Sequence, residues 1–238
     1  MAFGSDRQTS FSRATDSAII DEGLRTYMLR VYNYMATGLA ATGVVAYIVA
    51  NTPFLREAIF GTPLMWVVML APLGLVMYLS AKINSMSVSA AQTSFWVFSV
   101  LMGMSLASIF MIYTDTSIAR VFFITSGVFG AMSLYGYTTK KDLTGWGSFL
   151  FMGLIGIIIA SVVNMFLASS ALMFAISVIG VLVFVGLTAY DTQKIKNMYA
   201  ASDSASVTSK KAIMGALRLY LDFINLFIMM MHLFGARR

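Results

Sequence analysis

Seven long apolar segments constrain the fold of this chain more than any other feature of its sequence. A helix needs about 20 mostly apolar residues to cross the roughly 30 Å hydrocarbon core of a bilayer. Segments of this kind lie near residues 28–50, 64–81, 88–112, 119–137, 146–168, 171–190 and 212–234. We therefore predict an all-α integral membrane protein built as a bundle of seven transmembrane helices.

The composition supports this class of protein. Hydrophobic residues make up 59% of the 238 residues and charged residues 11%, whereas soluble domains are about 25% charged. Residues 1–27 are polar and lack the apolar core of a signal peptide. We expect them to form a cytoplasmic N-terminal tail, followed by a transmembrane domain over residues 28–238. The short linkers, including the one with Pro53 and Pro63, are predicted to be turns.

Basic residues set the expected orientation, because lysine and arginine concentrate in cytoplasmic loops. Eleven of them fall on the predicted N-terminal side: Arg7, Arg13, Arg25, Arg30, Lys82, Lys140, Lys141, Lys194, Lys196, Lys210 and Lys211. Four fall on the other side: Arg56, Arg120, Arg237 and Arg238. We therefore predict a cytoplasmic N-terminus.

Several classes of function lack support in the sequence. Cysteine is absent, which excludes disulfides and thiolate metal sites. The net charge of +6 is explained by the basic loops, and no soluble basic domain is present to bind nucleic acid. No His-Glu-x-x-His, Gly-x-Ser-x-Gly or Walker-type motif occurs, so we expect neither an enzyme nor a cofactor.

Small residues recur four positions apart, as in Ser126 and Gly130 and in Gly156 and Ala160. This spacing lets the backbones of neighbouring membrane helices approach closely. We therefore predict tight helix packing at these positions.

Two carboxylates in the apolar segments are the strongest candidates for a functional role. Asp191 closes the sixth segment and Asp222 lies inside the seventh. A carboxylate at the centre of a membrane helix costs about 2.5 to 3.5 kcal/mol on insertion scales, so it usually faces a partner or a wet cavity. If Arg218 marks the inner interface, Asp222 lies about 6 Å deeper, close to the expected level of Asp191.

Two carboxylates brought together cannot both ionise freely, so such a pair would titrate as a unit and sense pH. When ionised it would attract a hard cation such as calcium. Arg218, Asn225 and Lys82 are candidate supporting residues. In the alternative interpretation, Lys194 satisfies Asp191, and Arg218 or Asn225 satisfies Asp222, with no functional pair.

Two further residues are weaker candidates. His232 is the only histidine and is expected on another face of the helix from Asp222. Ser105 follows Gly103-Met104 in a Gly-x-Ser arrangement similar to that of rhomboid proteases, but serine is ordinary at helix contacts.

Three strings resemble the Bax-inhibitor family of transmembrane Bax-inhibitor-motif proteins, in its bacterial YbhL-like branch. They are GAMSLYGYTTKKDL (130–143), FVGLTAYDTQKIKNM (184–198) and ALRLYLDFINLF (216–227). The resemblance implies a bacterial inner-membrane location and a bundle with the C-terminal helix at its centre. It also implies that Asp191 and Asp222 form a pH-sensing pair that regulates a calcium leak.

The second apolar segment departs from the pattern of the family members studied as calcium leaks, which carry an acidic and a basic residue there. Here the segment has Pro72 and Gly74 in its middle, no carboxylate, and Lys82 at its end. Other bacterial relatives are associated with restraint of a membrane protease, a role that needs no pore. The resemblance therefore implies lipid, a cation and a membrane-protein partner as the candidates for binding.

Three functional hypotheses follow. The first is a pH-sensitive leak for calcium or another cation, controlled by the two aspartates. The second is a non-conducting regulator that binds another membrane protein, such as a membrane protease. The third is an intramembrane aspartyl protease, although its Gly-x-Gly-Asp and Pro-Ala-Leu signatures are absent.

Overall fold

The computed structural model describes residues 5–238, with side chains from Asp21 onward. Its helices are α1 (Ser5–Asn51), α2 (Pro53–Phe60), α3 (Leu64–Lys82), α4 (Val88–Ile112), α5 (Asp115–Thr138), α6 (Thr144–Leu167), α7 (Ser170–Asn197) and α8 (Ala205–Phe234). All except the short α2 are long and apolar enough to cross a membrane. The predicted all-α membrane bundle is therefore confirmed. Within the predicted 1–27 tail, residues 1–4 and the side chains of 5–20 lie outside the described part.

The linker between the first two membrane helices differs from the predicted turn. It contains helix α2, which begins at Pro53. Proline is well suited to the first helical position. Its fixed φ matches the helix, and an N–H at that position would have no partner within the helix in any case. The proline pair therefore marks a helix start as well as a turn.

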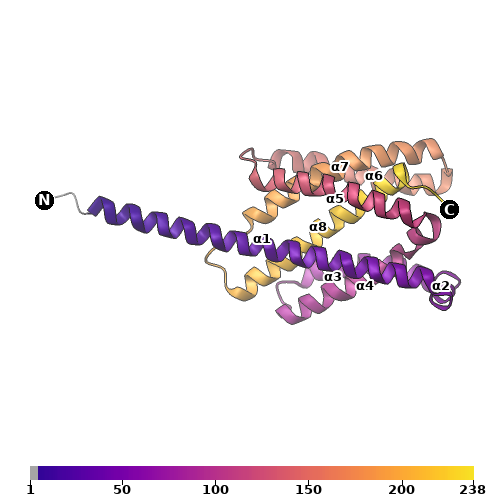
Figure 1. Cartoon of the computed structure of the whole chain (residues 1–238), viewed down its shortest axis with the longest axis horizontal. Coiled ribbons are helices and arrows are strands. Elements are labelled where there is room, and N and C mark those ends of the chain that lie inside the picture. Colours follow the sequence, from indigo (N-terminus) through magenta and orange to yellow (C-terminus); the bar gives the residue numbers. More distant parts are fainter. Residues whose placement is uncertain (1–4) are drawn as a thin grey trace.

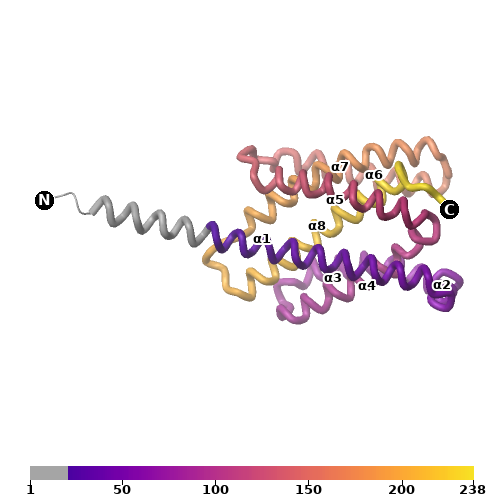
Figure 2. Tube along the Cα trace, in the orientation of Figure 1, coloured from indigo at the N-terminus to yellow at the C-terminus, as the bar shows by residue number. Residues whose placement is uncertain are grey.

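Helix α8 crosses between two groups of helices, which Figures 1 and 2 show on its two sides. One group contains α1, α3 and α4, and the other contains α5, α6 and α7. Helix α8 packs against α1 and α4 from the first group and against α5 and α7 from the second. In its most apolar stretch 67% of residues are buried, compared with 17 to 39% in the other membrane helices. It is therefore the membrane helix with the least surface left for lipid.

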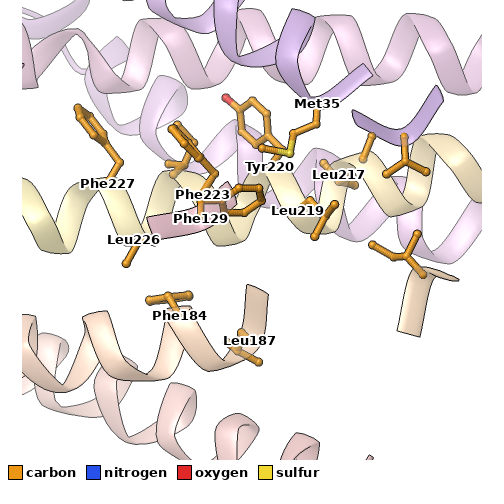
Figure 3. Packing of buried hydrophobic residues seen from close by; sticks show 14 of the residues in the cluster. Met35, Phe129, Phe184, Leu187, Leu217, Leu219, Tyr220, Phe223, Leu226 and Phe227 are labelled. Atoms are coloured by element: carbon orange, nitrogen blue, oxygen red, sulfur yellow. The ribbon is translucent and has the colours of Figure 1, made fainter. Parts of the chain in front are cut away.

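Aromatic and aliphatic side chains of α8 fill the space between the two groups. Tyr220, Phe223 and Leu226 are buried, and Figure 3 shows them with Phe129 of α5 and Phe184 of α7. Phe223 packs edge-on against Phe129, with ring centroids 5.5 Å apart. In lipid no hydrophobic driving force holds helices together, so van der Waals packing must do so. Aromatic pairs of this kind add to that packing energy.

Polar side chains also connect α8 to the first group. The hydroxyl of Thr42 on α1 lies 2.6 Å from that of Tyr220 and also donates to the carbonyl oxygen of Ser99 on α4. A buried hydroxyl without a partner would cost about 1 to 3 kcal/mol. This bonding therefore fixes how α8 sits against α1 and α4.

The close helix packing predicted at Gly130 and Gly156 is wrong at both glycines. A Cβ atom added at either position would meet no atom within 4 Å. The close approaches occur at other glycines, including Gly136, which contacts the backbone of Ala189 on α7, and Gly147, which contacts the Tyr190 ring. The spacing of small residues identifies helix faces that can pack closely, but it does not say which of them meet a neighbour.

Candidate functional site

Helices α7 and α8 carry the two membrane aspartates and pack against each other along their length. The loop between them is held by Lys211, whose Nζ donates to Asp203 Oδ2 at 2.6 Å and to the carbonyl oxygen of Met198 at 2.8 Å. Farther into the bundle, Gly215 leaves room for Ile195. These contacts set the register of the two helices, and that register decides which residues of α8 face Asp191.

Asp191 is 9% exposed and its partner is Arg218. The Nη1 atom of Arg218 lies 3.4 Å from Asp191 Oδ1. Lys194, the partner in the alternative interpretation, instead lies over the Tyr190 ring, 5.5 Å from its centroid. The structure therefore places Arg218 at the level of Asp191.

Asp222 is 6% exposed, and its Oδ2 atom has no hydrogen-bond partner among the residues whose side chains are described. Asn225 does not supply one, because its Nδ2 donates to the carbonyl oxygen of Leu221. Asp222 follows Arg218 by one turn of α8, so its carboxyl lies on the same side of the helix as the guanidinium that reaches Asp191. A proton on Asp222 would remove the charge of this buried carboxyl.

The cluster holds two acids and the guanidinium of Arg218, and Lys194 lies one turn after Asp191 on α7. With both carboxyls ionised, Arg218 neutralises one negative charge and the other stays inside the bundle, where an uncompensated charge costs several kcal/mol. The Arg218 side chain is 42% exposed, although α8 residues on either side of it are buried. This side chain therefore connects the acids with the surface of the bundle.

A chain of hydroxyl groups lies next to the acids and was not predicted. Thr192 follows Asp191 in α7, and its hydroxyl lies 3.0 Å from that of Ser133 on α5. The Ser133 hydroxyl in turn lies 2.5 Å from that of Tyr32 on α1. The three groups connect α7, α5 and α1 across the bundle. Serine, threonine and tyrosine are common in membrane helices, so the sequence does not distinguish these three residues from the others. Only the arrangement of the helices shows that their hydroxyls meet.

Gln193 and Lys196 fix the end of α7 to the last turn of α5 and to the loop that follows it. The Gln193 side chain accepts from the amide of Leu143 at 2.8 Å and donates to the carbonyl oxygen of Lys141 at 2.7 Å. Lys196 Nζ donates to the carbonyl oxygen of Tyr137. The segment that carries Asp191 is therefore anchored to α5 as well as to α8.

The other residues named from sequence lie apart from the acids. Lys82 ends α3, which packs chiefly against α4. His232 lies near the far end of α8, with its Nδ1 atom 3.5 Å from the Ser177 hydroxyl. The Ser177 hydroxyl donates at 2.8 Å to the carbonyl oxygen of Met173, so its proton is already engaged away from His232. Ser105 accepts a bond from Ser108 through its carbonyl oxygen.

The acids provide a poor resident metal site. Calcium takes six to eight oxygen ligands, and from Asp21 to Arg238 no group of three or more acidic, histidine or cysteine side chains converges on one point. Arg218 beside Asp191 also competes with a bound cation.

Comparison with known proteins agrees with this architecture. The sequence model of a family described as inhibitor of apoptosis-promoting Bax1 matches residues 24–238. The chain is 52% identical to inner membrane protein YbhL of Escherichia coli (strain K12), over 91% of this chain and 94% of that protein. It is 52% identical to a protein of Rickettsia prowazekii over 98% and 99% of the two chains. An uncharacterized membrane protein of Streptococcus pyogenes is 34% identical over 90% and 94%. The chain therefore belongs to the Bax-inhibitor family.

Proposed function

We propose that the protein is a pH-sensitive leak for calcium or a similar cation in the bacterial inner membrane, controlled by Asp191 and Asp222. The observation that carries the proposal is the buried Asp222 oxygen, which has no hydrogen-bond donor among the residues from Asp21 onward and lies one helical turn from the arginine that pairs with Asp191. Such an arrangement is stable with one shared proton and unstable without it.

Loss of the shared proton leaves two negative charges whose repulsion opens the leak. Two ionised carboxylates repel each other strongly inside a protein, where the effective dielectric constant is far below that of water. The repulsion acts between α7 and α8, the pair of helices that carries the acids. Separation of these helices would admit water and expose carboxylate oxygens, which hard cations prefer. The leak is therefore expected to increase as the pH rises.

The test is calcium flux into proteoliposomes from pH 6 to pH 8. The parent protein is expected to give a flux that rises with pH, and Asp222→Asn a flux that does not change with pH, because asparagine cannot exchange a proton. The thermal denaturation midpoint of each protein in detergent shows whether it is folded. Equal calcium flux from folded Asp222→Asn and from the parent at every pH would contradict the proposal.

Asp142 offers a matched control on an exposed loop. The side chain of Thr144 and its backbone amide, which donates to Asp142 Oδ1 at 2.9 Å, both lower the pKa of the Asp142 carboxyl below its ordinary value. An acid with a lowered pKa stays ionised throughout pH 6 to 8 and cannot cause a change in that range. Asp142→Asn is therefore expected to keep the pH profile of the parent.

A second candidate is a non-conducting regulator that binds a membrane protein such as a membrane protease. The observation that favours it is α3, which carries no carboxylate and packs chiefly against α4, away from the acids. Co-purification with a membrane protease that survives Asp191→Asn, together with no calcium flux from the parent, would favour this role over the leak.

A further inference from the structure

A large apolar groove opens between α1 and α5, on the side of the bundle where these helices flank α8. Its volume is about 910 Å³. Met35 of α1, Phe129 of α5 and Phe223 of α8 are buried residues along its lining, and Figure 3 shows Phe129 next to Phe223. The groove therefore lies where the two helix groups of the bundle meet.

Small residues widen this groove. Gly130 on α5 and Gly43 on α1 both line it, and a Cβ atom at either position would meet nothing within 4 Å. The lining extends along α5 from Phe122 to Tyr137, which is about 22 Å of helix. This length exceeds the roughly 15 Å thickness of the hydrocarbon in one leaflet. An extended acyl chain of a lipid can therefore lie in the groove along its whole length.

Positive charge stands at one end of the groove. Arg25 lines that end, is exposed, and forms no ion pair with any residue from Asp21 onward. Lys196 lies there too, with its Nζ 5.1 Å from the centroid of the Tyr137 ring that also lines the groove. The nearby acids, Asp21 and Glu22, are exposed in the turn of α1 before Arg25. Two cations at the polar end of an apolar groove favour an anionic headgroup.

We propose that this groove binds an anionic phospholipid, with an acyl chain along α5 and the phosphate near Arg25. A helix of a partner protein fits less well. A helix with its side chains is about 10 to 12 Å wide, whereas Tyr32 and Ser133 join α1 to α5 across the groove through hydroxyls 2.5 Å apart. That link prevents a helix from entering between α1 and α5, whereas an acyl chain can run along the groove on the lipid side of the link.

The test is to fill the groove with a larger side chain and to measure how much lipid remains bound. The purified full chain is incubated with phosphatidylglycerol or with phosphatidylcholine, and native mass spectrometry counts the lipids retained. The parent is expected to retain one lipid, with phosphatidylglycerol preferred. Gly130→Leu should lose this lipid, because its side chain occupies the groove without meeting other atoms. The matched control, Gly156→Leu, places the same side chain in open space on α6 and should keep it.

A second variant tests the headgroup. Arg25→Gln is expected to reduce the preference for phosphatidylglycerol over phosphatidylcholine about fivefold, which corresponds to the roughly 1 kcal/mol contributed by one basic residue near a membrane surface. Equal lipid retention by the two leucine variants would overturn the proposal. An unchanged preference in Arg25→Gln, or cross-linking of a second chain or a partner helix at Gly130, would overturn it as well.

Discussion

Gly136→Ala is expected to lower the stability of the bundle by about 1 to 3 kcal/mol or more, the range observed for overpacked cores. The physical reason is the contact between α5 and α7. A Cβ atom at Gly136 would overlap the backbone carbonyl oxygen of Ala189 and lie 2.9 Å from its Cα atom. Backbone atoms cannot move aside as a flexible side chain can, so the two helices must separate. The thermal denaturation midpoint in detergent is expected to fall by about 5 °C.

The control for this prediction lies on the same helix. Gly130→Ala adds the same methyl group where no atom lies within 4 Å, and alanine is the better helix former. Its midpoint should lie within about 2 °C of the parent. Equal midpoints for the two variants would mean that α5 and α7 do not meet at Gly136 in the membrane.

The Gly136 contact also bears on the acids. Ala189 is two residues before Asp191, and Ser133, one turn before Gly136, meets Thr192. Separation of α5 from α7 would therefore move the segment that holds Asp191 against Arg218. We expect Gly136→Ala to change the calcium flux at a given pH as well as the stability.

The seven membrane helices were predictable from sequence because the cost of placing polar groups in hydrocarbon leaves long apolar runs. The helix ends were less predictable. Helix α8 begins at Ala205, seven residues before the predicted apolar segment, and α7 continues to Asn197 beyond the predicted 190. Outside the hydrocarbon, a helix can continue through polar residues such as Lys194 and Lys210, so hydropathy does not mark its end.

The acids of the candidate site were predictable for a related reason. A carboxylate is so unfavourable in lipid that Asp222 stood out without any structure. Its surroundings could not be predicted, because Arg218, Lys194 and Asn225 all lie within a few residues of one acid or the other. The register of α8 against α7, set by contacts such as Gly215 with Ile195, decides that Arg218 reaches Asp191.

The two acids are expected to act as one titrating unit, and a set of three variants can test this. If they share one proton, Asp191→Asn, Asp222→Asn and the double variant each remove the shared titration. All three should then vary less than about twofold in calcium flux between pH 6 and pH 8. The parent should vary by at least about tenfold over this range, because the protonation ratio of an acid changes tenfold with each pH unit.

Non-additivity is the feature that separates a shared proton from two independent sites. Residues that act independently give effects that multiply in a double variant, and residues that act as a unit do not. The double variant should therefore resemble either single variant. A flux change in the double variant equal to the product of the two single changes would contradict the shared proton. The leak would then depend on two separate carboxylates, with Arg218 serving Asp191 alone.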